Sequence, residues 1–543
     1  MEFYIRGFIT VLRYVMPVLS VILMTVCGIG LLKKKKFPFK TVIITDDMKE
    51  RELPFGEYVI GEDEDCDIVI DGLEEKHAVL SVSASKYKIR PINKSKISVN
   101  RHPVKDETEF STDTLISMNN REFSLRKKAT KNSGRINKDI GKKTIAFCCL
   151  NLIQIFVLIS LIFAFKERSL ILISVFLLMI IGEWVYFGIT KFFGAFLEIP
   201  VMFMVTFGIN VAAHVSAGAV IKQAICLGAG ILGAILLSKI LMAPKWAIGL
   251  KGIALILGVA VFTFNIVFGV IYNGSQNWLN IAGFSFQPSE LIKVVLIFIC
   301  GAAADKLSSL KDMASFVAFT LFCLGSLAYL SDFGTALIYA CVLATVIFIR
   351  LCSVKVLAFM GGAAVLCGGV VLLVFPYVAQ RVFSFGQAWE NASNSGYQQT
   401  RTMVAAASGG LFGIGGGRGS LIKVPAADTD IVFGLICEEW GLIVALCILF
   451  FFALLALYAI KTLSFSSSTY YSVTVCAAAV LLMVQTSLNV FGSLDMLPFT
   501  GVTLPFISNG GSSLISCTVL MAFFRAALKD EQFIKTGERR LKK

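Results

Sequence analysis

The feature that most constrains this chain is a succession of apolar segments, each long enough, or nearly so, to cross about 30 Å of hydrocarbon. One covers about residues 9–32, and twelve more follow between about 144 and 527. Only 16% of the 543 residues are charged, whereas soluble proteins carry about 25%. These observations exclude a soluble enzyme, a disordered chain and a disulfide-rich secreted domain. They predict a polytopic all-α membrane protein of about thirteen helices with one polar insert.

Basic residues lie in alternate loops between the apolar segments, which is the pattern of cytoplasmic loops. The net charge of +14 therefore indicates topology and attraction to anionic membrane lipid, and we expect no nucleic-acid partner. The first apolar run is followed by basic residues, which favours a retained anchor over a signal peptide. We expect an external N-terminus, with the insert and the C-terminus in the cytoplasm. The basic groups are Lys33–Lys36, Lys138–Lys143, Lys306 with Lys311, Arg350 with Lys355, and Arg539–Lys543.

The 14 cysteines lie mostly inside apolar runs. They form no Cys-x-x-Cys pair, and no His-rich spacing accompanies them. We therefore expect free buried thiols, with neither a disulfide framework nor a zinc site.

The polar insert covers residues 37–135. It holds short alternating strands such as 58–60 and 67–70, with turn residues every 8–12 positions. This pattern predicts an all-β sandwich.

One external loop enters a helix through Pro288, and the charged pair Glu290 and Lys293 follows. Pro and acidic residues suit the first turn of a helix. Because Glu290 and Lys293 are three residues apart, they share a helix face. Two interpretations remain open: a satisfied ion pair with a capping role, or a charged functional site, since ionisable residues at membrane depth are costly.

Three further polar islands occupy the external side, at 331–335, 397–430 and 504–513. The second contains the Gly-rich run 409–419, whose backbone N–H groups could surround phosphate oxygens. A nucleotide P-loop is not indicated, because no strand precedes the run and no Lys-Ser/Thr pair ends it.

The four polar islands carry motifs in a known order. These are FSFQPSELIK (284–293), DFGTAL (332–337), SGGLFG (408–413) with VP (424–425) and TD (429–430) followed by EEWGLI (438–443), and LPFISNGGSS (504–513). On these motifs residues 193–527 resemble the SEDS family (shape, elongation, division and sporulation), which includes FtsW, RodA and SpoVE. The resemblance implies a ten-helix core. The expected domains are an anchor (1–36), the insert (37–135), two extra helices (136–192), the core (193–527) with a large external loop (376–430), and a basic tail (528–543).

The resemblance also implies an activity. Family members polymerise lipid II, an undecaprenyl-pyrophosphate-linked disaccharide, into glycan strands at the outer face of the bacterial cytoplasmic membrane. The family's indispensable Asp falls on Asp430, and an inverting transfer needs a general base to deprotonate the acceptor hydroxyl. A divalent cation (Mg²⁺ or Mn²⁺) or N–H groups would hold the departing diphosphate. A class B penicillin-binding protein is the implied partner. The substrate-binding candidates are Glu290, Lys293, Asp332, Arg401, Gly409, Gly410, Arg418, Lys423 and Ser512.

The chain departs from the family's pattern at several supporting positions. Where the family carries Glu and His before its Asp, this chain has Ala426 and Asp428. Asn277 stands in place of an Arg, Ile414 in place of a basic residue, and Asn509 in place of a Tyr. These departures suggest a divergent, slow or partner-dependent enzyme.

Residues 40–127 resemble a forkhead-associated (FHA) domain, on Val59-Ile60-Gly61, Asp65 to Ile70, His77 to Leu80 and Ile97 to Asn100. That fold usually reads phosphothreonine through an Arg, a Ser and an Asn. Those places are Glu62, Glu74 and Ser95 here. Because two carboxylates repel a phosphate dianion, we expect a degenerate docking or structural role. The nearby cations are Arg90, Lys94 and Lys96.

Two other function classes remain open. A flippase or transporter for a lipid-linked precursor predicts charges and broken helices near the bilayer midplane. A weakly active scaffold of the cell-wall machinery is favoured by the departures from the family pattern, while the retained Asp430 argues against it. The sequence does not distinguish elongation, division and sporulation.

Overall fold

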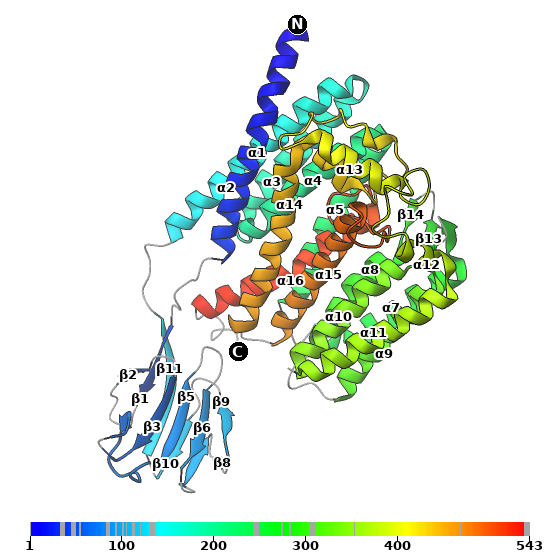
Figure 1. Cartoon of the computed structure of the whole chain (residues 1–543). Helices are drawn as coiled ribbons and strands as arrows, with labels where there is room; N and C mark the ends of the chain where they lie inside the picture. The colour runs from blue at the N-terminus through cyan, green and yellow to red at the C-terminus, as the bar shows by residue number, and fades with distance from the viewer. Residues whose placement is uncertain are drawn as a thin grey trace. The chain divides into compact units, whose positions relative to one another are not determined.

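A computed structural model describes the fold (Figure 1). The residues it describes are 2–32, 39–44, 50–53, 56–63, 65–82, 87–92, 95–99, 102–104, 106–110, 115–119, 121–129, 136–242, 249–272, 275–281, 284–303, 310–351, 353–465 and 469–536. The chain divides into two compact units. Residues 34–136 form the bulk of one, and the helices on either side of them in sequence form the other.

The smaller unit is built from two β-sheets around one apolar core. One sheet has the strand order β2-β1-β11-β10-β7-β8 and the other β4-β3-β5-β6-β9. All neighbours pair antiparallel except β3 with β4, which are parallel. The strands are β1 (Phe39–Ile44), β2 (Glu50–Leu53), β3 (Gly56–Gly61), β4 (Ile68–Val69), β5 (Ala78–Val82), β6 (Tyr87–Pro91), β7 (Ile97–Val99), β8 (His102–Val104), β9 (Thr108–Phe110), β10 (Leu115–Met118) and β11 (Arg121–Ala129).

Alternating burial explains why these short strands form a sandwich. In β5 every second side chain (Ala78, Leu80 and Val82) is buried. Leu125 of the first sheet and Ile89 of the second are fully buried in the same core. A period of two places one face of each strand inside. The predicted all-β insert is therefore present.

The larger unit is a bundle of long apolar helices. Eleven helices within the described residues are long and apolar enough to cross a membrane, and Met313–Tyr329 of α9 is a shorter apolar helix. The helices are α1 (Glu2–Leu32), α2 (Ile136–Ala164), α3 (Ser169–Thr190), α4 (Ala195–Val215), α5 (Ala217–Leu241), α7 (Lys251–Phe268), α8 (Pro288–Ala303), α9 (Leu310–Tyr329), α10 (Phe333–Leu351), α11 (Val354–Val374), α12 (Pro376–Phe383), α13 (Tyr397–Gly409), α14 (Val432–Phe465), α15 (Thr469–Ser493) and α16 (Gly511–Thr536), with 3-10 turns at Lys166–Arg168 and Leu421–Lys423.

Helices in this bundle differ sharply in burial. Most of α4 is enclosed by its neighbours, whereas α11 has no buried residue. Helices that are apolar on all sides are either enclosed by protein or exposed to lipid. The chain is therefore a polytopic helical membrane protein with a β-sheet domain after its first helix.

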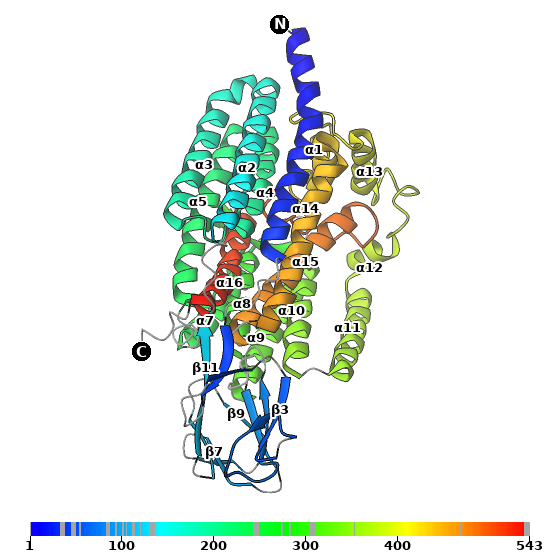
Figure 2. The same ribbon diagram turned by 90° about the vertical axis from the view of Figure 1, so that its left-hand side faces the viewer.

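The first helix packs within the bundle, against helices that come much later in the sequence. Figure 2 shows α1 alongside α14. Gly28 faces Leu454 of α14, and Gly30 faces the Phe196 ring of α4 so closely that a Cβ would clash. Lys461 donates to the carbonyl oxygen of Leu31 at 3.1 Å. The predicted anchor thus forms part of the helical core.

Two segments expected as loops contain secondary structure. The stretch before α8 forms a three-stranded antiparallel sheet of β12 (Val270–Tyr272), β13 (Ser275–Ile281) and β14 (Phe284–Phe286). The long stretch 376–430 contains α12 and α13. In both segments Gly, Ser, Asn and Gln interrupt the apolar residues, so the periodicity of the sequence gave little signal.

Candidate active site

Asp430 lies in a turn directly before α14, and its backbone is held from three sides. Its N–H donates to the carbonyl oxygen of Ala426 at 2.9 Å. The side-chain amide of Asn489 (α15) donates to the carbonyl oxygens of Asp430 and Val502, at 2.9 and 2.7 Å. The Ser508 hydroxyl donates to the carbonyl oxygen of Thr429 at 2.6 Å. These contacts fix Asp430 against the segment between α15 and α16.

The carboxylate of Asp430 is partly buried and faces a glycine. A Cβ at Gly501 would lie 3.3 Å from its Oδ2 atom. The pKa of Asp430 is raised from 3.8 to about 6, chiefly by burial, and the negative charge of Asp428 acts in the same direction. The Thr429 hydroxyl and the positive charge of Arg381 (α12) act in the opposite direction. A carboxylate with this pKa is mostly ionised at neutral pH and is a better proton acceptor than an ordinary Asp.

Asp428, two residues earlier, is bound to the last of the predicted polar islands. Its Oδ2 atom accepts from the side-chain amide of Asn509 at 3.0 Å. Its carbonyl oxygen accepts from the backbone N–H of Asn509 at 2.9 Å. These two hydrogen bonds therefore hold Asp428 and Asn509 together beside Asp430.

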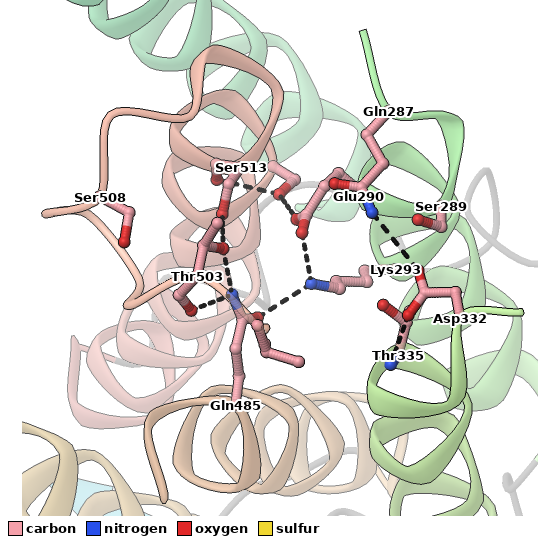
Figure 3. A network of polar contacts seen from close by, with 12 residues as sticks. Gln287, Ser289, Glu290, Lys293, Asp332, Thr335, Gln485, Thr503, Ser508 and Ser513 are labelled. Atoms are coloured by element: carbon pink, nitrogen blue, oxygen red, sulfur yellow. Dashed lines mark hydrogen bonds and ion pairs between the residues drawn. The ribbon is translucent and has the colours of Figure 1, made fainter. Parts of the chain in front are cut away.

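Glu290 and Lys293 lie on α8 and form a closed ring of polar contacts with α15 and α16 (Figure 3). Lys293 Nζ donates to Glu290 at 2.8 Å and to Gln485 at 3.0 Å. Gln485 donates to the carbonyl oxygen and hydroxyl of Thr503 at 3.0 and 3.1 Å. The Ser516 hydroxyl closes the ring by donating to Glu290 at 2.9 Å. This geometry matches the ion-pair interpretation, because the Lys293 side chain has no exposed surface.

Asp332 caps the helix that follows it. Its Oδ1 atom accepts from the backbone N–H of Thr335 at 3.0 Å, and Oδ2 accepts from Gln287 at 3.4 Å (Figure 3). Asn277, which replaces the family's Arg, also donates to Asp332. Burial raises the pKa of Asp332, and its hydrogen bonds from Thr335 oppose that shift. Asp332 thus joins the three-stranded sheet to α10.

The Gly-rich run lies against a break in α14. Gly441 has φ +84°, and a Cβ there would collide with the backbone of Leu411. The broken helix exchanges backbone hydrogen bonds with the run: Ile414 and Gly415 donate to Glu438 and Glu439, and Leu442 donates to Gly410.

The side chains of Glu438 and Glu439 bind the remainder of the run. Glu439 Oε1 accepts from Gly419 N–H at 2.8 Å, and Glu438 accepts from the N–H groups of Ser420 and Leu421 at 2.9 and 3.0 Å. The N–H groups of residues 413–415 and 419 in the run, and of Ser420 and Leu421 after it, already donate to protein oxygens. Those groups are therefore engaged within the protein.

The other predicted substrate residues differ in their exposure. Arg401 is exposed on α13 and stacks over the Tyr397 ring at 5.3 Å. Arg418 and Lys423 are exposed as well, and Gly410 is exposed with φ +56°. Gly409 is buried against the backbone of Cys437, and Ser512 is buried at the start of α16.

Three residues at the site were missed in the sequence: Arg381, Gln485 and Asn489. Gln485 and Asn489 are four residues apart in an apolar segment, so one helix face carries two buried amides. Polar residues with that spacing at membrane depth are a usable signal. Arg381 gave no such signal in the sequence, because it lies in a polar stretch where an arginine is ordinary.

No three His, Cys, Asp or Glu side chains cluster as they would around a metal ion within the described ranges. Asp428 and Asp430 alone do not make up a typical set of oxygen ligands for Mg²⁺ or Mn²⁺. We derive no step through a metal ion.

Comparison with known proteins identifies the core. The sequence profile of the FtsW, RodA and SpoVE cell cycle proteins matches residues 184–532, more than half of the chain. The chain belongs to the FtsW, RodA and SpoVE family. An FHA domain profile matches residues 58–119, within the β-sandwich.

Named relatives agree with this family. The probable peptidoglycan glycosyltransferase FtsW of Bacillus subtilis is 31% identical over 314 residues, which cover 54% of this chain and 76% of the relative. Stage V sporulation protein E of the same organism is 30% identical over 260 residues, 45% of this chain and 69% of the relative. A solved chain of a peptidoglycan synthase complex has the same fold, with a TM-score of 0.52 at 24% identity, over 62% of this chain and 97% of that chain.

The matched profile begins inside α3, so α1 and α2 lie outside the FtsW, RodA and SpoVE core. The β-sandwich contains the three residues expected from the sequence to replace the phosphate-reading residues. Ser95 is buried and donates to the Glu74 carboxylate at 2.6 Å, and Glu62 accepts from Gly72 N–H at 3.4 Å. Arg90 and Lys96 are exposed, and Lys94 lies outside the described residues.

Proposed function

We propose that this membrane protein, a peptidoglycan glycosyltransferase of the FtsW, RodA and SpoVE family, polymerises lipid II with Asp430 as general base. The acceptor sugar's 4-hydroxyl attacks C1 of the donor sugar, and the lipid pyrophosphate leaves from the opposite face. The configuration at C1 therefore inverts. Asp430 accepts the hydroxyl proton as the new glycosidic bond forms.

The observation that carries this proposal is the environment of Asp430. Its backbone is fixed by Asn489 and Ser508, while its carboxylate is only partly buried. A base is most effective when its pKa lies close to the working pH, and burial brings the pKa of Asp430 to about 6. Below that pH the carboxylate is protonated, so we expect the rate to fall.

The diphosphate leaving group needs positive charge. Arg401, Arg418 and Lys423 are exposed on the stretch 376–430, and Arg381 acts electrostatically on Asp430. We assign these four cations to lipid II, with Gly409, Gly410 and Ser512 shaping the backbone around it. Glu290, Lys293 and Asp332 are then supporting residues that brace this surface from within.

We further propose thirteen crossings: the eleven long helices together with α8 and α9. Alternating loop charge then places stretch 376–430 outside the bacterial cytoplasmic membrane, and the FHA domain and basic tail inside. We also propose the domain boundaries expected from the sequence.

The solved relative belongs to a peptidoglycan synthase complex, and we propose that this chain likewise works beside a class B penicillin-binding protein. Such a transpeptidase cross-links the strands that the glycosyltransferase makes.

The deciding experiment compares purified wild-type protein with Asp430→Asn on purified lipid II, each with and without a class B transpeptidase. Losing a general base costs about 10²–10⁴-fold in rate. The side chain keeps its size, so the variant should be recovered in detergent at wild-type yield. Polymerisation by Asp430→Asn at the wild-type rate would remove Asp430 from this role.

A flippase is the second candidate, and the break at Gly441 together with the buried Glu290–Lys293 pair favours it. Broken helices and buried charges are typical of transporters. Proteoliposomes decide between the two: a flippase would move fluorescent lipid II between leaflets with Asp430→Asn as well as with wild type, and would not join disaccharides.

A further inference from the structure

Asp428 and Asn509 stand where the family's motifs carry other residues, and the structure brings these two departures into contact. They are joined twice, by the side-chain hydrogen bond of 3.0 Å and by the backbone hydrogen bond of 2.9 Å. Asn509 follows Ser508 in the chain, and the Ser508 hydroxyl donates to the carbonyl oxygen of Thr429 at 2.6 Å. The two hydrogen bonds between Asp428 and Asn509 therefore continue the contacts that hold the turn around Asp430.

A second carboxylate next to a general base changes how readily that base ionises. Two charged side chains act on Asp430: Asp428 from its own turn and Arg381 from α12. The segment between α15 and α16, which also packs against Asp430, brings Gly501 to its carboxylate and contains no Lys or Arg. Its charged residue, Asp495, accepts from the N–H groups of Gly386 and Ala388. Like charges disfavour the ionised form, whereas opposite charges favour it.

Asn509 determines where the charge of Asp428 lies. A side-chain amide donor stabilises an ionised carboxylate and holds its rotamer. Without that donor, Asp428 would be free to turn toward water, where its effect on Asp430 would be screened.

We propose that Asp428 and Asn509 form one unit, a carboxylate and the amide that orients it, which sets the pH at which Asp430 becomes an effective base. The proposal rests on the proposed role of Asp430. Asp428 is a positioning residue here, because it acts through Asp430 and not on the substrate. Its negative charge makes Asp430 a stronger base. The same charge makes the enzyme lose activity at a higher pH when the solution is acidified.

The test is the pH dependence of lipid II polymerisation by purified full-length protein. The acid limb is the part of the plot of polymerisation rate against pH where the rate falls as the pH is lowered. In Asp428→Asn this limb should move to lower pH by about half a unit, because removing a negative charge favours ionised Asp430. Asn509→Ala should move it the same way by less. The double variant should match Asp428→Asn, because Asn509 acts only through Asp428.

Two controls bound the result. Arg381→Gln should move the limb to higher pH, because it removes a positive charge from Asp430. Asp495→Asn removes a different external carboxylate, which accepts from Gly386 and Ala388 N–H at 3.1 and 3.0 Å. It should leave the limb in place even if the rate falls.

An unmoved limb in Asp428→Asn, or shifts that simply add in the double variant, would overturn the proposal. If Asp428→Asn is not recovered folded, Asn509→Ala alone decides, since an unmoved limb there refutes the orienting role. Wild-type activity in Asp430→Asn would have a different meaning: it would refute the proposed role of Asp430 as the general base.

Discussion

Lys293 is a cation with no exposed surface, and two polar neighbours offset the free-energy cost of burying it. Glu290 supplies the opposite charge, and Gln485 supplies a second acceptor. Because Gln485 also donates to Thr503, the ring ties α8 to the segment that packs against Asp430. A buried charge left without its partner is far more costly than the pair.

Lys293→Met should therefore destabilise the protein by about 3 kcal/mol or more, since Glu290 would be left buried and uncompensated. The double variant Glu290→Gln/Lys293→Met should regain much of that loss, because no charge remains. Thermal melting in detergent, followed by size-exclusion chromatography, measures both. Equal melting temperatures for the single and double variants would show that the ion pair contributes little.

At the scale of the element, α14 is two helices joined at Gly441. The break releases backbone groups that pair with the Gly-rich run, so the short first part of α14 and the run hold each other. Asp430 lies at the start of that first part. Non-helical backbone at membrane depth is tolerated where protein satisfies its polar groups.

Gly441→Ala should lower the melting temperature and the polymerisation rate together. An L residue at φ +84° costs about 1–2 kcal/mol, and its Cβ would meet the Leu411 backbone as well. Gly362→Ala on α11 is the matched control, because a Cβ there meets nothing within 4 Å. That change should be neutral or stabilising. A neutral Gly441→Ala would mean that the break adjusts freely.

The sequence predicted the β-sandwich and the helical bundle, because hydropathy and strand periodicity report burial directly. It missed the contacts of the Gly-rich run. Its backbone N–H groups donate to Glu438 and Glu439, and these contacts depend on a helix break that no residue pattern specifies. The contact between Asp428 and Asn509 was also invisible, because 81 residues separate them in the chain.

At the scale of the whole molecule, topology can be tested by labelling. With exposed Cys148 and Cys367 changed to Ser, Ser393→Cys should react with an impermeant thiol reagent on intact cells. Lys76→Cys in the FHA domain should react only after lysis, because basic loops place that side in the cytoplasm. Labelling of Lys76→Cys from outside would reverse the orientation.

The FHA domain offers a test of its own. Glu74, bound to Ser95, occupies a place where a phosphate reader is expected, and Glu62 occupies another. Because carboxylates repel phosphate, phosphothreonine peptides should bind the full-length protein no better than unphosphorylated ones in calorimetry. A clear phosphate-dependent affinity would show that cations such as Arg90 and Lys96 have taken over recognition.

The packing of α1 has a consequence for biogenesis. This helix precedes in the chain the two helices that contact it, α4 and α14. Between α1 and α14 the ribosome makes the FHA domain and most of the bundle. α4 can therefore pack against α1 early, whereas Gly28 and the carbonyl oxygen of Leu31 meet their α14 partners only after α14 is made. The packing of α1 is therefore completed only when α14, in the last third of the chain, has been made.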